Sequence, residues 1–284
     1  MKDLKALSKW LTANKISLNA SKTELLYFKN NNISPGIKIK LQGKLIFPSE
    51  YVKYLGVFLD EKLSGIKHCE EFVKKLNRSN GMLSRARHFM PLDDLKKLFH
   101  AIFSSHLMYS CQVWNQKLIS VTNKISTLQN KALRIMTFSD FNAHSEPLFK
   151  NLNILKFSDS ITLKNCLFAY DFLRGRLPMA FPKGTFSRIK DLHSARTRKL
   201  ATGMLYAPKF KNITFGHKSI YRSCILSWNN FTSKFNKQNK EKIVNKMKTI
   251  DIDLRYYSRS QLKSKITKFI LSTLSTYSNP AFGT

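Results

Sequence analysis

The sequence has 284 residues, with 49 lysines and arginines against 17 acidic residues, so its formal net charge is +32. This excess exceeds what solubility requires and predicts a polyanionic partner. An apolar fraction of 43% excludes a disordered basic tail, four dispersed cysteines exclude a disulfide scaffold, and no apolar run is long enough for a membrane helix. We therefore expect a folded protein without a membrane span in a reducing, intracellular compartment, with nucleus and cytoplasm not distinguished.

The first 60 residues are predicted to form one helix followed by short strands. Leu4, Leu7, Trp10 and Leu11 recur at helical spacing and predict an amphipathic helix over 3–14. Strands are predicted over 23–28, 37–41, 44–47 and 52–59, because apolar runs there are bounded by residues typical of turns. The two-residue turn Gln42-Gly43 predicts a hairpin, so we expect a small antiparallel sheet.

From residue 65 onward the apolar periodicity becomes helical. Helices are predicted over 66–90, 91–110 and 119–138, and Pro91, Asp93 and Asp94 are typical of the start of the second one. A short and a longer helix are predicted within 145–175 and a loop-rich stretch over 178–217, then helices over 217–235, 238–249 and 259–275. The predicted fold class is α+β and mostly α-helical.

The positive charge is concentrated in acid-free stretches. Residues 72–92 contain no acidic residue, and Lys74, Arg78 and Arg85 fall on one helical face, away from Leu76 and Leu83. Residues 192–240 also lack acids and carry ten lysines and arginines. A helix with one apolar and one cationic side suits docking on a core while following phosphates. The alternative is an ordinary solvated basic face.

A more specific pattern lies near the N-terminus. It reads Trp10-x₃-Asn14-x-Ile16-x-Leu18-Asn19-x₂-Lys22-Thr23-x₃-Tyr27-Phe28, followed by Tyr54-Leu55-Gly56-Val57-Phe58-Leu59-Asp60. In order and spacing it resembles the reverse transcriptases of non-LTR (LINE-type, jockey-like) retrotransposons. A looser similarity continues downstream through Tyr109-x₄-Trp114, Asn130–Arg134, Leu177-Pro178, Arg196-x-Arg198 and Trp228-Asn229.

The resemblance implies an architecture. Residues 1–60 would be the end of the polymerase palm, a small antiparallel sheet with the primer-grip hairpin. Residues 61–140 would be a helical thumb, and residues 141–284 a basic, helical C-terminal region.

The resemblance also implies contacts with nucleic acid. Lys22 would contact the phosphates or departing pyrophosphate of a nucleotide, although a plain basic turn residue is the alternative. Gly56 would let the backbone approach a primer strand, or would serve a β-bulge or simple packing. Tyr54 would pack on a primer sugar or fill the core. The full set of predicted nucleic-acid-binding residues is Lys22, Tyr54, Leu55, Gly56, Lys74, Arg78, Arg85, Arg196 and Arg198.

The catalytic part of the family's pattern is missing. Polymerase chemistry needs paired carboxylates that hold two magnesium ions, and in the family these come from elements that precede the matched segment. The pair Asp93-Asp94 follows Pro91 at a predicted helix start, so no catalytic role is expected for it. We expect no catalytic residue, metal site or cofactor in this chain, with magnesium belonging to the parent enzyme.

The sequence therefore predicts a reverse-transcriptase fragment that binds an RNA–DNA hybrid or another duplex backbone without polymerising by itself. Its other expected partner is the upstream part of the polymerase. One alternative is an active enzyme once upstream fingers and palm sequence complete it, and another is a degenerate remnant. An unrelated RNA-binding module is a weaker alternative, because no signature of a common RNA-binding fold is present.

Overall fold

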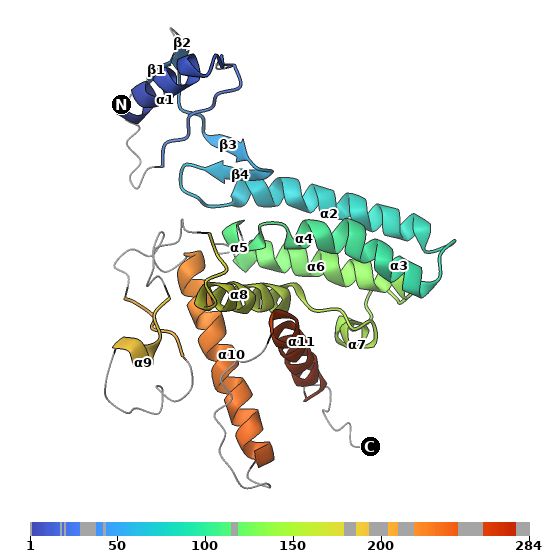
Figure 1. The fold of residues 1–284 in the computed structure, drawn as a ribbon. Coiled ribbons are helices and arrows are strands. Elements are labelled where there is room, and N and C mark those ends of the chain that lie inside the picture. Colours follow the sequence, from blue (N-terminus) through green and yellow to red (C-terminus); the bar gives the residue numbers. More distant parts are fainter. Residues whose placement is uncertain are drawn as a thin grey trace, which may run out of the picture. The chain divides into compact units, whose positions relative to one another are not determined.

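A computed structural model of the chain describes residues 2–17, 19, 21–28, 38–41, 44–114, 119–178, 186–192, 204–209, 219–243 and 258–276. The chain forms two compact units, Met1–Val73 and Lys74–Thr284, which are described separately (Figure 1). The predicted palm, thumb and C-terminal boundaries at 60/61 and 140/141 remain predictions.

The first unit begins with α1 (Lys2–Ala13), which confirms the predicted amphipathic helix. Leu11 is buried on its inner side. The helix ends in a Schellman motif, since Ile16 N donates to Leu11 O at 2.9 Å and Lys15 N donates to Thr12 O at 3.1 Å. Lys15 takes the left-handed position of that motif, with φ 54°.

Two antiparallel hairpins follow. In the first, β1 (Ile39–Leu41) pairs with β2 (Lys44–Ile46), which confirms the predicted strand pairing, while the turn 42–43 lies outside the described residues. In the second, β3 (Tyr51–Tyr54) pairs with β4 (Val57–Asp60). The prediction of one continuous strand over 52–59 was therefore wrong. Leu55 and Gly56 both have positive φ, 46° and 81°, so the chain reverses between them.

The predicted strand over 23–28 was also wrong. Those residues are all described, and they form a single parallel bridge, between Leu25 and Pro48. Ser49 N donates to Leu25 O at 2.8 Å. The composition of 23–28 favours a strand, but a strand also needs a neighbour paired along its length, and here the pairing ends after one residue.

The next helices largely follow the prediction. α2 (Ile66–Ala86) buries Phe72, Leu76 and Leu83 as the apolar stripe indicated. It ends at Ala86, so the predicted continuation over 87–90 was wrong, and Met90 precedes proline, a position that disfavours helical backbone. The predicted helix 91–110 is divided into α3 (Leu92–Phe99), a π-helical turn η1 (His100–Ser104) and α4 (Ser105–Met108), and α5 (Cys111–Trp114) follows it.

The remaining helices belong to the second unit. α6 (Ile119–Met136), α7 (Ser145–Asn151), α8 (Phe157–Leu173) and α11 (Arg259–Thr276) match predicted helices, and α9 (Ile189–Leu192) is a short helix within the predicted loop-rich stretch. α10 (Ile220–Ile243) runs through the predicted break at 236–237. The prediction of a break was wrong. A helix can continue through these residues, because an asparagine inside a helix costs only about 0.5 kcal/mol relative to alanine.

The core of the second unit is built around α8. This helix contacts α4, α5, α6, α10 and α11, and α10 and α11 lie beside it in Figure 1. Its buried residues are distributed around its circumference, as in a central helix. Trp228 and Phe231 from α10 and Ile266 from α11 pack into the same cluster as Tyr170. The mostly helical α+β fold with small antiparallel sheets is thus confirmed.

Candidate nucleic-acid interface

Lys22 lies in a turn built by Asn19. The Asn19 side-chain oxygen accepts from Ser21 N at 3.1 Å and from Ser21 Oγ at 2.6 Å. The Asn19 carbonyl accepts from Lys22 N at 3.1 Å and from Thr23 Oγ1 at 2.9 Å. Asparagine and threonine in this motif thus shape the turn, and they leave the Lys22 side chain exposed.

Tyr54, Leu55 and Gly56 come together at the tip of the β3–β4 hairpin. Tyr54 is 63% exposed and Leu55 is 72% exposed, so neither side chain fills a core here. A left-handed conformation at Leu55 is unfavourable for a branched side chain. Gly56 lies in the hairpin turn. Its role there is neither of the two structural alternatives given above, a β-bulge and simple packing. The hairpin therefore presents two large apolar side chains to the surface.

The hairpin is fastened to the first turns of α2. Phe58 N donates to the buried His68 Nδ1 at 3.4 Å, and the His68 ring stacks on Phe72 with centroids 5.9 Å apart. The Asp60 carboxylate accepts hydrogen bonds from Lys62 N, Ser64 N, Ser64 Oγ and Gly65 N, at 2.8–3.1 Å. Asp60, the last residue of the motif, therefore orders the loop that leads into α2.

Two lysines lie over aromatic rings beside this hairpin. Lys53 Nζ is 5.6 Å from the Phe58 ring centroid, and Lys67 Nζ is 5.3 Å from the Tyr51 centroid. The two rings contact each other edge to face at 6.1 Å. Sequence reasoning missed this cluster, although the strand register, which opposes Lys53 to Phe58, would have indicated it once the turn was known.

α2 carries the predicted cationic row. Lys74, Arg78 and Arg85 are exposed, whereas Leu76 and Leu83 have no exposed surface. Two buried polar side chains fix the inner face of the same helix. Ser79 Oγ donates to Ile102 O in η1 at 2.9 Å, and Asn80 Nδ2 donates to Leu128 O in α6 at 3.1 Å. The helix is thus held on the core with its basic side outward.

The remaining predicted residues are placed as follows. Arg196 and Arg198 lie outside the described residues. Lys22 and the hairpin tip belong to the first unit, and Lys74, Arg78 and Arg85 belong to the second. Tyr54, Leu55 and Gly56 share one hairpin tip, and the three cations share one helix face.

Asp93 and Asp94, the adjacent acidic pair named in the sequence, lie at a helix start. Asp93 and Asp94 lie in the first turn of α3, where Asp94 Oδ1 is 2.7 Å from Lys97 Nζ. In the part of the chain that the structure describes, no three residues among His, Cys, Asp and Glu are grouped as metal ligands. Asp93-Asp94 instead serves the helix terminus, where negative charge is favourable.

Two of the weaker downstream motifs, Tyr109-x₄-Trp114 and Trp228-Asn229, have structural roles. Trp114 Nε1 donates to Tyr109 O at 3.0 Å, and its ring stacks on Phe157 at 5.8 Å. Asn229 binds both backbone groups of Leu205, accepting from Leu205 N and donating to Leu205 O at 2.8 Å each. These motifs hold the second unit together, and the buried members are not available to a ligand.

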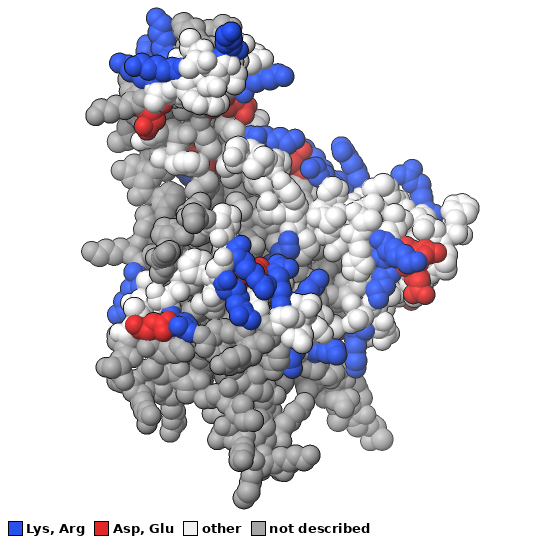
Figure 2. Space-filling model, viewed as in Figure 1, with Lys and Arg blue, Asp and Glu red and all other residues white. Residues whose placement is uncertain are grey.

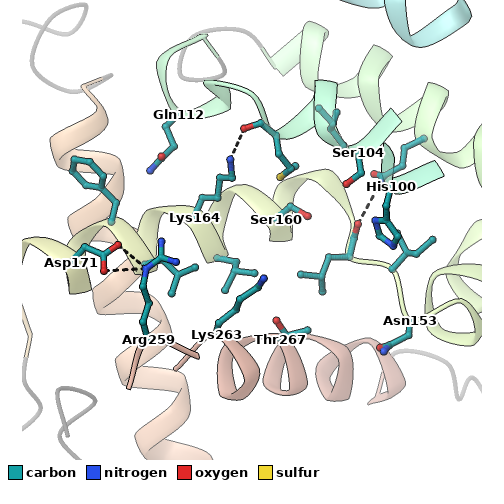
Figure 3. Close-up of a pocket in the computed structure, with 18 residues that line it drawn as sticks. His100, Ser104, Gln112, Asn153, Ser160, Lys164, Asp171, Arg259, Lys263 and Thr267 are labelled. Atoms are coloured by element: carbon teal, nitrogen blue, oxygen red, sulfur yellow. Dashed lines mark hydrogen bonds and ion pairs between the residues drawn. The ribbon is translucent and has the colours of Figure 1, made fainter. Parts of the chain in front are cut away.

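A cavity of about 550 Å³ lies in the second unit among η1, α4, α8 and α11 (Figure 3). Lys164, Arg259 and Lys263 line it, and Asp171 is the one acidic residue among the described residues of its lining. Arg259 Nε lies 2.9 Å from Asp171 Oδ2, and Lys164 Nζ donates to Met108 O. These residues are too far apart in the sequence for any local pattern to have indicated the cavity. Its lining could hold an anion.

The surface carries the charge imbalance of the sequence. In Figure 2, lysine and arginine side chains gather in patches on the face shown, with acidic side chains beside them at few points. The described surface is therefore suited to a polyanion.

Among the helices that the structure describes, none is both long and apolar enough to cross a membrane.

Comparisons with known proteins agree with the motifs. The chain is 29% identical over 163 residues to the RNA-directed DNA polymerase from mobile element jockey of Drosophila funebris, a match that covers 56% of this chain and 18% of the relative. The jockey polymerase of Drosophila melanogaster is 28% identical over 163 residues, with the same coverage. The probable RNA-directed DNA polymerase from transposon X-element of D. melanogaster is 24% identical over 157 residues, 54% of this chain and 17% of the relative.

The predicted resemblance is thus confirmed: the chain is distantly homologous to the reverse transcriptases of jockey-like non-LTR retrotransposons. The match spans less than a fifth of the length of these relatives. No protein-family model matches the sequence. No solved structure matches it either.

Proposed function

We propose that this chain is part of a retrotransposon RNA-directed DNA polymerase and that it binds the backbone of the template–primer duplex. The observation that carries the proposal is α2, whose inner face is fixed on the core while Lys74, Arg78 and Arg85 stand exposed in one row. Distant homology to polymerases that copy RNA into DNA favours nucleic acid over other polyanions.

In this proposal the chain comprises the palm end, the thumb and a basic C-terminal region. The hairpin tip of Tyr54, Leu55 and Gly56 contacts the primer strand, and Lys22 contacts nucleotide phosphates. Exposure of these side chains supports both assignments. Arg196 and Arg198 add further phosphate contacts in the C-terminal region.

Catalysis in this proposal belongs to carboxylates outside the chain. Magnesium would supply charge stabilisation at the transferring phosphoryl group in the parent enzyme, and no step of it is assigned to residues here. A complete enzyme would therefore need the upstream palm and fingers as a partner.

A salt titration tests the backbone contacts. Filter binding of an RNA–DNA duplex to the full chain should show affinity that falls steeply with salt, by a log–log slope of about 0.9 per phosphate contact. Replacing Lys74, Arg78 and Arg85 together by alanine should lower the magnitude of that slope by about 2 to 3 and weaken binding at least about tenfold at moderate salt.

The control removes equal charge from the same unit. Lys124, Lys131 and Lys150 are also exposed, and their combined replacement by alanine should change the affinity much less. Equal losses in the two triple variants would show that binding follows net charge alone. That result, or a slope near zero in the unaltered chain, would contradict the proposal.

A further inference from the structure

An aromatic and cationic cluster lies where the end of α2 meets the end of α6, within the second unit. The Arg87 guanidinium is 4.6 Å from the centroid of the Phe138 ring, and the His88 ring meets the same ring edge to face at 5.9 Å. These contacts join the segment after α2 to the segment after α6. Neither segment contributes a residue to the row proposed above for duplex binding.

Phe138 occupies a backbone position that phenylalanine disfavours. It has φ 52° and is the left-handed residue of the Schellman motif that ends α6, with Phe138 N donating to Ile135 O at 3.5 Å and Ser139 N to Arg134 O at 3.1 Å. The equivalent positions after α7 and α8 hold Asn153 and Gly175, the residue types that tolerate it, and the position after α1 holds Lys15.

The ring at this position is not there to fill a core. Phe138 is 58% exposed, so burial of its ring offsets little of the backbone cost. Unfavourable backbone conformations that persist are concentrated at functional sites. The left-handed backbone at Phe138 therefore costs local stability that burial of the ring does not offset.

Two further rings are exposed in the adjoining residues. Phe89 is 88% exposed and Phe141 is 80% exposed, and each lies within three residues of a member of the cluster. The charges nearby favour an anionic ligand, because Arg85 and Arg87 belong to the acid-free stretch 72–92. The neighbouring acids are Asp140 and, in α3, Asp93 and Asp94, of which Asp94 is paired with Lys97.

We propose that Phe138, with Arg87 beside it and the exposed rings of Phe89 and Phe141 close to the cluster in the sequence, is a stacking site for unpaired nucleobases. Its ligand is a single-stranded nucleic-acid segment, such as a template overhang that leaves a duplex. Aromatic rings stack on any base, and arginine adds a cationic contact to phosphate or base. The inference rests on the proposed function, because the nucleic acid bound there would reach this surface. A protein partner would not account for the cationic surroundings of Phe138.

The experiment compares three probes on the full chain. They are a blunt RNA–DNA duplex, the same duplex with an overhang of about six nucleotides that contains 2-aminopurine, and the same duplex with an abasic overhang of equal length. The base-bearing overhang should raise affinity about tenfold and quench 2-aminopurine fluorescence, since a base stacked on an aromatic ring adds favourable binding free energy. The abasic overhang carries the same phosphates and should add much less.

Phe138→Gly is the decisive variant. Glycine is favoured at this left-handed position, so the variant should fold at least as stably as the original. It should lose most of the gain from the base-bearing overhang and the fluorescence quenching, while blunt-duplex affinity stays unchanged. Phe138→Trp should retain the affinity gain and the quenching. The double variant Phe89→Ala with Phe141→Ala should reduce the gain and the quenching. Phe47→Ala, which removes a 64% exposed ring from another part of the chain, should change neither.

The outcomes separate the two proposals. An unaltered overhang gain in Phe138→Gly and in the double alanine variant would overturn the stacking site while leaving duplex binding intact. A change in self-association of Phe138→Gly in sedimentation, with the overhang gain unchanged, would also overturn it, in favour of a protein-docking role. If the blunt duplex fails to bind but the base-bearing overhang binds in a Phe138-dependent way, the proposed function fails and the stacking site stands.

Discussion

The four cysteines show how burial sets the chemistry of single residues. Cys69, Cys111, Cys166 and Cys224 are free, buried thiols. Burial raises the pKa of all four, to about 12 for Cys69 and Cys224. A thiol with so high a pKa is a weak nucleophile near neutral pH, because the thiolate is the reactive form. These cysteines act as small apolar core residues.

The thiols yield a pH prediction. The pKa of an unfolded cysteine is about 8.5, whereas burial raises the pKa of the folded Cys69 and Cys224 to about 12. Above the unfolded pKa the folded state binds more protons, so the free energy of unfolding should fall as pH rises from about 9. Cys69→Ala and Cys224→Ala should flatten that fall in urea titrations. Near pH 8 a thiol reagent should label the four cysteines only after denaturation, and rapid labelling of the native chain would contradict this.

Leu55 shows a conflict between turn geometry and surface chemistry. Asparagine is favoured before glycine in a hairpin turn with two positive φ values, and Leu55 is 72% exposed. Leu55→Asn should therefore raise the free energy of unfolding by about 1 kcal/mol in urea titrations. If the hairpin tip contacts a primer strand, the same variant should bind duplex more weakly. A less stable variant would contradict the left-handed turn.

At the scale of elements, buried polar side chains join one helix to the next. Gln129 in α6 has only 2% of its surface exposed. Its Nε2 donates to Leu155 O and its Oε1 accepts from Phe157 N, both at 2.9 Å, so it supplies the partner that a backbone group at the start of α8 needs.

Replacing Gln129 should therefore destabilise the second unit strongly. Gln129→Met keeps the size of the side chain but removes the partners of one buried and one partly buried backbone group, which should lower the free energy of unfolding by about 2 to 4 kcal/mol. Asn123→Leu, an exposed change on the same helix, should stay within about 0.5 kcal/mol. Urea titrations of both variants provide the measurement. Similar effects in the two would mean that Gln129 makes no such bridge.

At the scale of the whole molecule, the chain has a large positive charge, and among its described residues no three of His, Cys, Asp and Glu are grouped as metal ligands. We therefore expect the purified 284-residue chain to bind a primed template but not to extend the primer when nucleotides and magnesium are supplied. Primer extension on a gel is the measurement. Extension that Asp93→Asn with Asp94→Asn abolishes would contradict the assignment of catalysis to other sequence.

Adding upstream sequence separates the remaining alternatives. If a longer chain that includes upstream palm and fingers sequence extends the primer, the present chain is the nucleic-acid-binding part of an active enzyme. If the longer chain is also inactive and the present chain does not bind duplex, a degenerate remnant is favoured and the proposed function is wrong.

The sequence by itself determined the helices that have strong periodicity, the exposed row on α2 and the family resemblance. These depend on residues close together in the chain, such as Leu76, Lys74 and Arg78, whose spacing alone decides which side of a helix they occupy. The hairpin of β1 and β2 was predictable for the same reason, since a two-residue turn is a local signal.

Only the tertiary structure decided the features that need distant residues. It divided the strand expected over 52–59 at Leu55 and Gly56, and it left 23–28 without a pairing partner along its length. It also assembled the lining of the cavity from Lys164 and Arg259 and brought Arg87 onto Phe138. Strand pairing and long-range side-chain contacts depend on which segments meet in three dimensions, and no local spacing records that.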